Sequence, residues 1–157
     1  MEEMHLHFWG RGNKLMNKLV SISCMSEQAV QMINITEEVH RIVAESGITN
    51  GLVAVITAHT TTGITINEPL ECVETDILQR LEKLVPDDDK YIHAHFLPSY
   101  GATSNNSPGH LKSMLLGNNC MFPIQESRMV CGSAQHIYLV ECDGPQTRKV
   151  YIQMMGE

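Results

Sequence analysis

The residues best suited to chemistry lie between His59 and Glu68, where one histidine, four threonines, an asparagine and a carboxylate occur within ten residues. They follow an apolar run at residues 52–58 that is typical of a buried strand. Polar and apolar side chains then alternate as far as Asn67, and this period of two predicts a second, half-buried strand. The histidine would stand at the end of the first strand, beside the polar side chains of the second.

Glu68 creates a conflict within this pattern. If the second strand continues that far, the carboxylate shares a face with the apolar side chains of Ile64 and Ile66. A carboxylate on an apolar face must be paired, bound to a metal or neutralised, since burying a bare charge is costly. If the strand ends first, Glu68 only marks its end. We expect function at this segment because of that conflict.

Two more histidines, His93 and His110, stand near other polar groups. His93 closely follows Tyr91, and His110 lies beside Lys112. Histidine and carboxylate ligands with one open position are the usual composition of catalytic metal sites. However, these residues lie in separate predicted elements, so their spacing alone does not bring them together. Each histidine could instead be bonded to a backbone carbonyl, and from the residues alone both interpretations stay open.

The elements that must position these residues follow from periodicity. Apolar side chains recur at helical spacing over residues 36–46 and 73–85, and a glycine or a proline ends each of these helices. A shorter helix is predicted over residues 110–116, and its first N–H groups are free to bind an anion. Strands are predicted at residues 19–25 and repeatedly within 120–155. We therefore predict an α+β fold of layered, largely antiparallel sheets with two main helices and one short helix.

Length and composition limit the classes of function. The chain has 157 residues, a formal net charge of -7 and a sequence pI near 5.6, which argues against a nucleic-acid partner. It has no apolar run of about 18 residues, so we expect no membrane span. Residues 1–17 lack the apolar core of a signal peptide and are interpreted as an N-terminal appendage to a single domain at residues 18–157. The five cysteines lack Cys-x-x-Cys spacing and are interpreted as ordinary thiols of a cytoplasmic protein.

Several motifs occur in a fixed order along the chain. They are His59-Thr60-Thr61, Thr65-Ile66-Asn67-Glu68, Asp76, Val85-Pro86-Asp87, Tyr91-x-His93, the run from His110 to Gly117, Pro123, Gly132, Gln135, Ile137-Tyr138-Leu139, Glu141 and Asp143-Gly144-Pro145. In these motifs the sequence resembles the YjbQ-like family over roughly residues 18–157. The resemblance implies a compact α+β fold, a homotrimer and activity as a secondary thiamine-phosphate synthase. It also implies a pocket, lined by histidines and acidic groups, that holds a metal or an anion.

The resemblance also implies roles for individual residues. The catalytic residues would be His59, Glu68 and Lys112, and the cofactor would be a divalent zinc, magnesium or manganese ion. The metal ligands would be His59, His93, His110 and Glu68. The substrate-binding residues would be Thr60, Thr61, Asn67, Lys112 and Gln135, and His136, where the chain departs from the family pattern, is expected to add a further contact. Of these, Lys112 would contact phosphate as a point charge.

The chain departs from the family pattern at a place that could shape the pocket. The family sequence Gly-Thr-Trp-Gln-Gly reads here Gly132-Ser133-Ala134-Gln135-His136. A methyl group replaces an indole at Ala134, and an imidazole that can donate or accept a hydrogen bond replaces a hydrogen atom at His136. We expect both changes to alter the choice of ligand.

The resemblance predicts an enzyme that joins a pyrimidine diphosphate to a thiazole phosphate. Such a reaction needs basic groups and a divalent cation to stabilise the leaving pyrophosphate. The chain has no Gly-x-x-x-x-Gly-Lys-Ser/Thr loop, so P-loop nucleotide hydrolysis is not indicated. Two alternatives stay open: a non-catalytic protein that binds a metal or a small phosphorylated metabolite, and a metal-assisted hydrolase.

Overall fold

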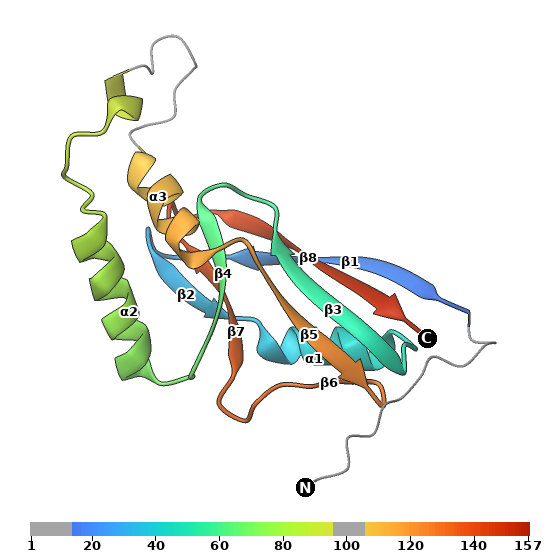
Figure 1. Ribbon diagram of the computed structural model, residues 1–157. Helices are drawn as coiled ribbons and strands as arrows, with labels where there is room; N and C mark the ends of the chain where they lie inside the picture. The colour runs from blue at the N-terminus through green and yellow to red at the C-terminus, as the bar shows by residue number, and fades with distance from the viewer. Residues whose placement is uncertain (1–13, 96–105) are drawn as a thin grey trace, which may run out of the picture.

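The structure is a computed structural model that describes residues 14–95 and 106–157 (Figure 1). Its strands are β1 (Met16–Met25), β2 (Gln31–Asn34), β3 (Asn50–Thr57), β4 (Thr62–Asn67), β5 (Asn119–Gln125), β6 (Arg128–Met129), β7 (His136–Glu141) and β8 (Thr147–Gly156). Its helices are α1 (Thr36–Glu45), α2 (Glu71–Leu84) and α3 (Ser107–Leu116), with a 3-10 turn, η1 (Ile92–His95), before α3. Within the described ranges, no helix has the length and apolar character needed to span a membrane.

The strands form two sheets. The five-stranded sheet has the order β1-β8-β3-β5-β6, and the three-stranded sheet has the order β2-β7-β4. Every pairing in the two sheets is antiparallel. This arrangement confirms the predicted α+β fold with layered, antiparallel sheets.

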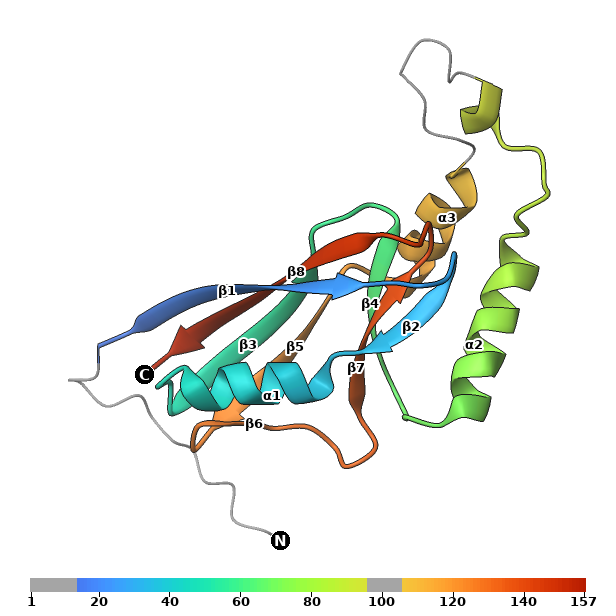
Figure 2. The same cartoon turned by 180° about the vertical axis from the view of Figure 1, so that it is seen from behind.

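β7 divides the interior into two apolar clusters, because successive side chains of a strand point to opposite faces. Ile137 and Leu139 join the main cluster, which lies between the five-stranded sheet, α1 and the three-stranded sheet. Tyr138 and Val140 join a second cluster, to which α2 and α3 contribute side chains. The three-stranded sheet is therefore covered on both faces, and Figure 2 shows α1 and α2 on opposite sides of it.

α1 shows how local sequence fixes these elements. Val39 and Val43 lie one turn apart and are fully buried in the main cluster, where each contributes about 1.5–3 kcal/mol. At the end of the helix the Ser46 hydroxyl donates to the Val43 carbonyl (2.7 Å). Gly47 follows with a φ of 74°, a conformation that glycine adopts at little cost. The helix stops there, and the chain turns towards β3.

The helices predicted at residues 36–46, 73–85 and 110–116 are confirmed, with bounds that differ by a few residues. α3 begins earlier than predicted, with a proline in its first turn. Proline is tolerated there because the N–H group that it lacks would have no partner within the helix at that position. The sequence pattern does not predict β2, which is only four residues long and is held by its pairing with β7. β1 starts at Met16, slightly before the predicted start of the domain, and residues 1–13 of the predicted appendage lie outside the described residues.

Candidate functional site

The predicted site residues divide between the two ends of β4. Its first residue, Thr62, pairs with Glu141 of β7, and its last residue, Asn67, pairs with His136. At about 3.3 Å per residue, the two ends lie about 17 Å apart. The histidine end comprises His59, Thr60, Thr61, His93, His110 and Lys112. The groove end comprises Asn67, Glu68, Gln135 and His136.

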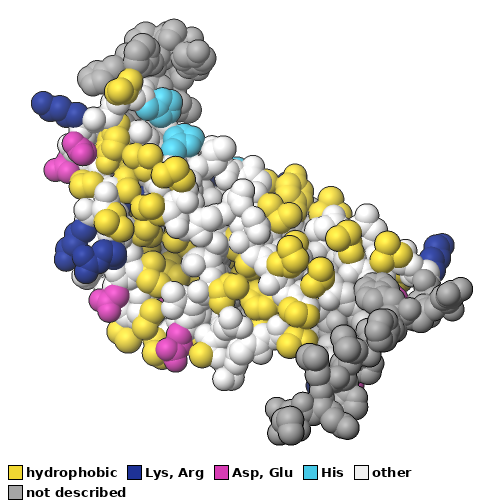
Figure 3. Space-filling model, in the orientation of Figure 1, with side chains coloured by type: hydrophobic (Ala, Val, Ile, Leu, Met, Phe, Trp, Pro, Cys, Tyr) yellow, Lys and Arg dark blue, Asp and Glu magenta, His cyan; other side chains and the backbone are white. Residues whose placement is uncertain are grey.

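Two histidines meet at the histidine end. The ring centroids of His93 in η1 and His110 in the first turn of α3 lie 5.6 Å apart, with the ring planes at 67°. The chain before His93 is held by the Tyr91 hydroxyl, which donates to the Pro86 carbonyl (2.7 Å). Figure 3 shows histidine side chains gathered at this end of the molecule. The structure therefore brings together two of the three histidines that were predicted as metal ligands.

The start of α3 packs closely against the connection between β7 and β8. A Cβ atom at Gly109 would lie 2.7 Å from the Cys142 carbonyl oxygen, so a larger residue would force the two segments apart. Asn106, just before the helix, donates from Nδ2 to the Asp143 carboxylate (3.0 Å). Its Oδ1 is buried, and no group in the described part of the chain bonds to it. A buried polar atom without a partner points to a water, an ion or a ligand group that completes it.

His59 is oriented by the backbone of β8. Its Nε2 accepts a hydrogen bond from the Lys149 N–H (2.9 Å), so the neutral ring carries its proton on Nδ1. Burial, and next the Arg148 guanidinium, lower the pKa of His59, so the ring is neutral at pH 7. His59 is therefore available as a hydrogen-bond donor. To act as the predicted metal ligand it would have to give up the bond from Lys149.

A buried ion pair between Arg148 and Glu141 is close enough to His59 for both charges to affect the pKa of the ring. Arg148 donates from Nε to Glu141 Oε2 (2.6 Å) and from Nη2 to Glu141 Oε1 (2.5 Å). Burial alone would raise the pKa of Glu141, but the bonds from Arg148 and from the Asp143 N–H reverse the effect and leave that pKa lowered. Arg148 also donates to the Thr61 hydroxyl (3.0 Å). Thr61, which is buried, is therefore already engaged by the protein.

Lys112 does not present its charge to solvent. Its side chain is 1% exposed, and its Nζ donates to Glu82 (2.6 Å) and to Asp87 (2.7 Å). Burial alone would lower the pKa of Lys112, but the bonds to Asp87 and Glu82 raise it above the usual value. To contact phosphate as predicted, Lys112 would have to leave two carboxylates. The neighbouring helix residue Ser113 donates to the Thr60 carbonyl (2.6 Å), which fixes α3 over the β3–β4 loop.

Lys149 is a cation of the histidine end that is not among the predicted site residues. It is exposed, and its charge acts on His59, whose ring its backbone orients. On the alternation of β8, Lys149 lies on the face opposite to the buried Arg148. That alternation is the only signal in the sequence that could have separated the two cations.

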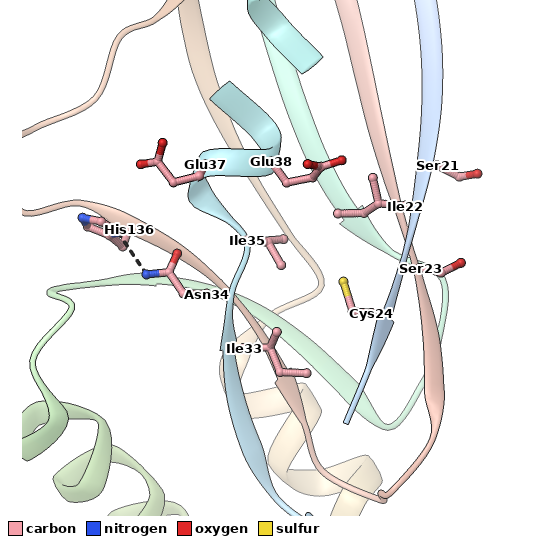
Figure 4. A pocket seen from close by; sticks show the side chains of 10 residues that line it. All are labelled: Ser21, Ile22, Ser23, Cys24, Ile33, Asn34, Ile35, Glu37, Glu38 and His136. Atoms are coloured by element: carbon pink, nitrogen blue, oxygen red, sulfur yellow. Dashed lines mark hydrogen bonds between the residues drawn. The ribbon is translucent and has the colours of Figure 1, made fainter. Parts of the chain in front are cut away.

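His136 lines a groove of about 720 Å³ at the groove end, between β1 and the chain that leads from β2 into α1 (Figure 4). Its Nδ1 accepts from Asn34 Nδ2 (3.0 Å), and Asn34 Oδ1 accepts in turn from the Thr36 hydroxyl (2.6 Å). The lining of the groove includes apolar and acidic side chains, among them Ile22, Ile33, Ile35, Glu37 and Glu38. Ala134 is exposed on the chain before β7. A ligand-binding role for His136 stays a prediction, which its place in a groove supports.

Glu68 is exposed and follows the last residue of β4, so the strand ends before the carboxylate could be buried. Asn67 Oδ1 accepts from the Glu68 N–H (2.9 Å), and Gln135 Oε1 accepts from the Gly132 N–H (2.8 Å). Because β4 separates Glu68 from His59, the carboxylate does not join the histidines within the chain. The expected cluster of three histidines and Glu68 is therefore not formed there.

A metal ion would find only a partial set of ligands at the histidine end. Among the described residues, no three histidine, cysteine, aspartate or glutamate side chains are placed to hold one ion. His93 and His110 can supply two nitrogen ligands, and water or ligand oxygen atoms would fill the other positions. Two protein nitrogens are one fewer than the three protein ligands of a catalytic zinc site, so the described residues do not by themselves complete a metal site.

Comparisons with known proteins agree on one family. A family model described as UPF0047 protein YjbQ-like matches residues 20–157. A UPF0047 protein of Archaeoglobus fulgidus is 35% identical over 136 residues, which cover 87% of this chain and 100% of that protein. Bacillus subtilis YugU is 37% identical over 127 residues, 80% of this chain and 90% of that protein. The crystal structure of a YbjQ-like protein of unknown function from Sulfolobus solfataricus P2 has a TM-score of 0.85 at 29% identity, covering 92% of this chain and 100% of its own.

Proposed function

Because the chain belongs to the YjbQ-like family of UPF0047 proteins, we propose that it binds a small phosphorylated metabolite at the histidine end. His93 and His110 would hold a divalent metal ion, which would supply positive charge to a leaving group in a transfer reaction of the thiamine-phosphate synthase type. The observation that carries the proposal is the pair of imidazole rings 5.6 Å apart at the start of α3. Two imidazoles at this distance can supply two ligands to one ion.

The start of α3 supports the anion part of the proposal. No side chain in the described ranges caps its first N–H groups, and its first turn holds no acidic residue. Free N–H groups at a helix start carry partial positive charge and attract anions. The exposed Lys149 and the Nδ1–H of His59 add a cation and a donor at the same end of the molecule.

The charges nearby support the metal part. Lys112 and Arg148, both buried, are already neutralised by carboxylates. They therefore add little to the stabilisation that a leaving pyrophosphate needs, and a bound divalent ion would supply that charge. Imidazole ligands favour zinc over magnesium, which prefers oxygen ligands. Zinc is accordingly our first choice of metal, with manganese second.

Non-catalytic binding of the same ligand is the second candidate function. The observation that favours it is the pairing of Lys112 and Arg148, which leaves the site with little free positive charge of its own. The two functions differ in turnover. Pyrophosphate release from a pyrimidine diphosphate, dependent on a thiazole phosphate, would establish the transferase, whereas binding of both compounds without release would establish the second function.

The metal site is tested by titrating zinc and manganese into chelator-stripped protein at several pH values. Protons compete with a metal for imidazole near the usual histidine pKa of about 6.5, so we expect affinity to fall steeply from about pH 7.5 to about pH 5.5. His110→Asn should lower the affinity by more than about tenfold, since even lost outer-shell partners have effects of that size. His136→Asn, at the groove end, is the matched control and should leave the affinity unchanged.

Two results would contradict metal binding by the histidine pair. One is an affinity that stays flat across this pH range, and the other is an equal loss in both variants. If zinc and manganese do not bind at any pH, the site is an anion site only. Phosphate binding should then improve in acid, because protonated histidines attract it, so the two alternatives have opposite pH dependences.

The homotrimer remains part of the proposal, with the outer face of the five-stranded sheet as the contact surface. Large apolar side chains are exposed on neighbouring strands of this face: Leu19, Leu52, Met121 and Met155. Figure 3 shows apolar side chains spread over this sheet. An extended apolar face of this kind is typical of a subunit interface. The free state of all five cysteines fits the proposed cytoplasmic location.

Light scattering at micromolar concentration tests the assembly. The protein should have the mass of a trimer, and Leu52→Glu should convert it to monomers by placing a charge in the contact surface. Leu84→Glu changes a residue that is also exposed but lies on α2, and it should leave the trimer intact. A monomeric protein, or equal effects of the two substitutions, would argue against this surface.

A further inference from the structure

A thiol and an imidazole meet on the side of the molecule that carries α1. Cys131 Sγ lies 3.8 Å from His40 Nε2, within the range of a hydrogen bond to sulfur. His40 lies in the middle of α1, and Cys131 lies in the connection between β6 and β7. Both residues are partly exposed, so a small reagent can reach them. We propose that this pair is a nucleophilic site at which soft carbon electrophiles modify Cys131 while His40 accepts the thiol proton.

The two partners are held in place by their surroundings. His40 is carried by a helix whose neighbouring residues, Val39 and Val43, are fully buried. Cys131 packs partly against the main apolar cluster. The connection around it is fixed on both sides, because the Val130 N–H donates to the Pro123 carbonyl (2.8 Å) and the Gln135 N–H donates to the Gly132 carbonyl (3.0 Å). The contact is therefore part of the fold.

Within residues 14–95 and 106–157, no imidazole is hydrogen-bonded to any of the other four thiols. Burial raises the pKa of Cys120 and of Cys142 to about 12, which keeps both thiols protonated and unreactive. Burial, with a smaller effect of Glu38, also raises the pKa of Cys24. Cys72 is exposed at the start of α2 and is reachable by reagents. The labelling rate of Cys72 thus serves as the internal standard, because its reactivity depends on exposure alone.

The reaction with iodoacetamide shows how the pair acts. The Cys131 sulfur attacks the methylene carbon, a sulfur–carbon bond forms, and the carbon–iodine bond breaks to release iodide. The thiol proton passes to His40 Nε2, which requires the neutral ring to carry its own proton on Nδ1, and then to water. No oxidant or reductant takes part. An α,β-unsaturated carbonyl compound would react at the same sulfur by addition.

The test is competitive labelling of the folded protein with a limiting amount of iodoacetamide at about pH 7, followed by mass spectrometry of the cysteine peptides. We expect Cys131 to be labelled faster than Cys72, although Cys72 is more exposed. His40→Gln should slow the labelling of Cys131 by about tenfold or more relative to Cys72, since general-base assistance is worth at least that much. Arg41→Gln, on the same helix, is the matched control and should change neither rate.

His40→Ala separates base assistance from simple access. If His40 only shields the sulfur, removing the ring should speed the labelling of Cys131, whereas a lost base should slow it. An unchanged or faster rate in either His40 variant would overturn the proposal. If a variant unfolds, Cys120 and Cys142 will also be labelled, and the comparison within the unaltered protein then decides. There, labelling of Cys131 slower than that of Cys72 would overturn the proposal.

Discussion

Two buried cations at the histidine end are paired in opposite ways. Arg148 and its partner Glu141 are both buried, with side chains 5% and 0% exposed. Lys112 is 1% exposed, but its partners Glu82 and Asp87 are 51% and 62% exposed. The first pair lies wholly within the core, where neither charge can reach water. The second joins α3 to the end of α2, and its carboxylates can return to solvent if the bond breaks.

The largest effect is expected when the wholly buried pair is broken. Glu141→Gln leaves the Arg148 guanidinium buried without its carboxylate, and loss of one partner of a buried pair costs about 3–5 kcal/mol. Urea denaturation measures the loss. A double variant, Glu141→Leu with Arg148→Met, removes both charges and should be more stable than the single variant. A loss below about 1 kcal/mol in Glu141→Gln would remove the distinction between the two pairs.

Lys112→Met should have a smaller and more local effect. The apolar side chain fits a buried position, and the two carboxylates become solvated, so the loss is that of hydrogen bonds to a charged group, about 1.5–3 kcal/mol. The end of α2 should then open more often, which amide hydrogen exchange measures as faster exchange near Glu82. Lys83→Met, on the exposed side of the same turn, is the control. Unchanged exchange near Glu82 would show that other contacts hold α2.

Removing one of the two exposed carboxylates should matter less. In Glu82→Gln and in Asp87→Asn, Lys112 keeps one charged partner, and the lost partner was largely in water. Each substitution should lower the free energy of unfolding by less than about 1 kcal/mol. Denaturant unfolding measures both variants. A loss as large as that of Glu141→Gln would mean that Lys112 also behaves as part of the core.

The smallest effect concerns pH and His59. Because the folded state lowers the pKa of His59, the stability linked to this ring is complete above about pH 6.5 and is lost as pH falls through the folded-state pKa. The lowered pKa of Glu141 acts further into acid: its contribution is present above about pH 4.3 and is lost below it. His59→Gln should therefore flatten the stability curve just below about pH 6.5 and leave the acid limb unchanged. An unchanged curve in both regions would show that His59 protonation is not coupled to folding.

The fold could be predicted largely from local patterns, and the arrangement of the candidate site could not. The spacing of Val39 and Val43 predicts α1 because a helix places residues one turn apart on one face. The separation of Glu68 from His59 depends on the length of β4. The position of His136 opposite Asn67 depends on pairing with a strand about seventy residues away, which no local pattern encodes.

The partners of Lys112 show that local sequence patterns also do not predict which charged side chains pair. A lysine on a short helix is usually solvated, and the sequence gives no sign that two carboxylates from α2 and the turn after it enclose this one. The exposure of Lys149, by contrast, follows from the alternation of β8 once its strand is recognised. Predictions thus held where neighbours along the chain decide the outcome and failed where contacts between distant segments do.

β4 also limits the size of any molecule that could contact both the histidine end and the groove end of the chain. With its ends about 17 Å apart, a compact metabolite bound at the histidine pair cannot touch His136 at the same time. An elongated ligand, such as two heterocycles joined through a diphosphate, has the reach to span that distance. Ligand length should therefore decide the outcome of compound screening. Short molecules should bind at one end or the other, and only long molecules can contact both ends.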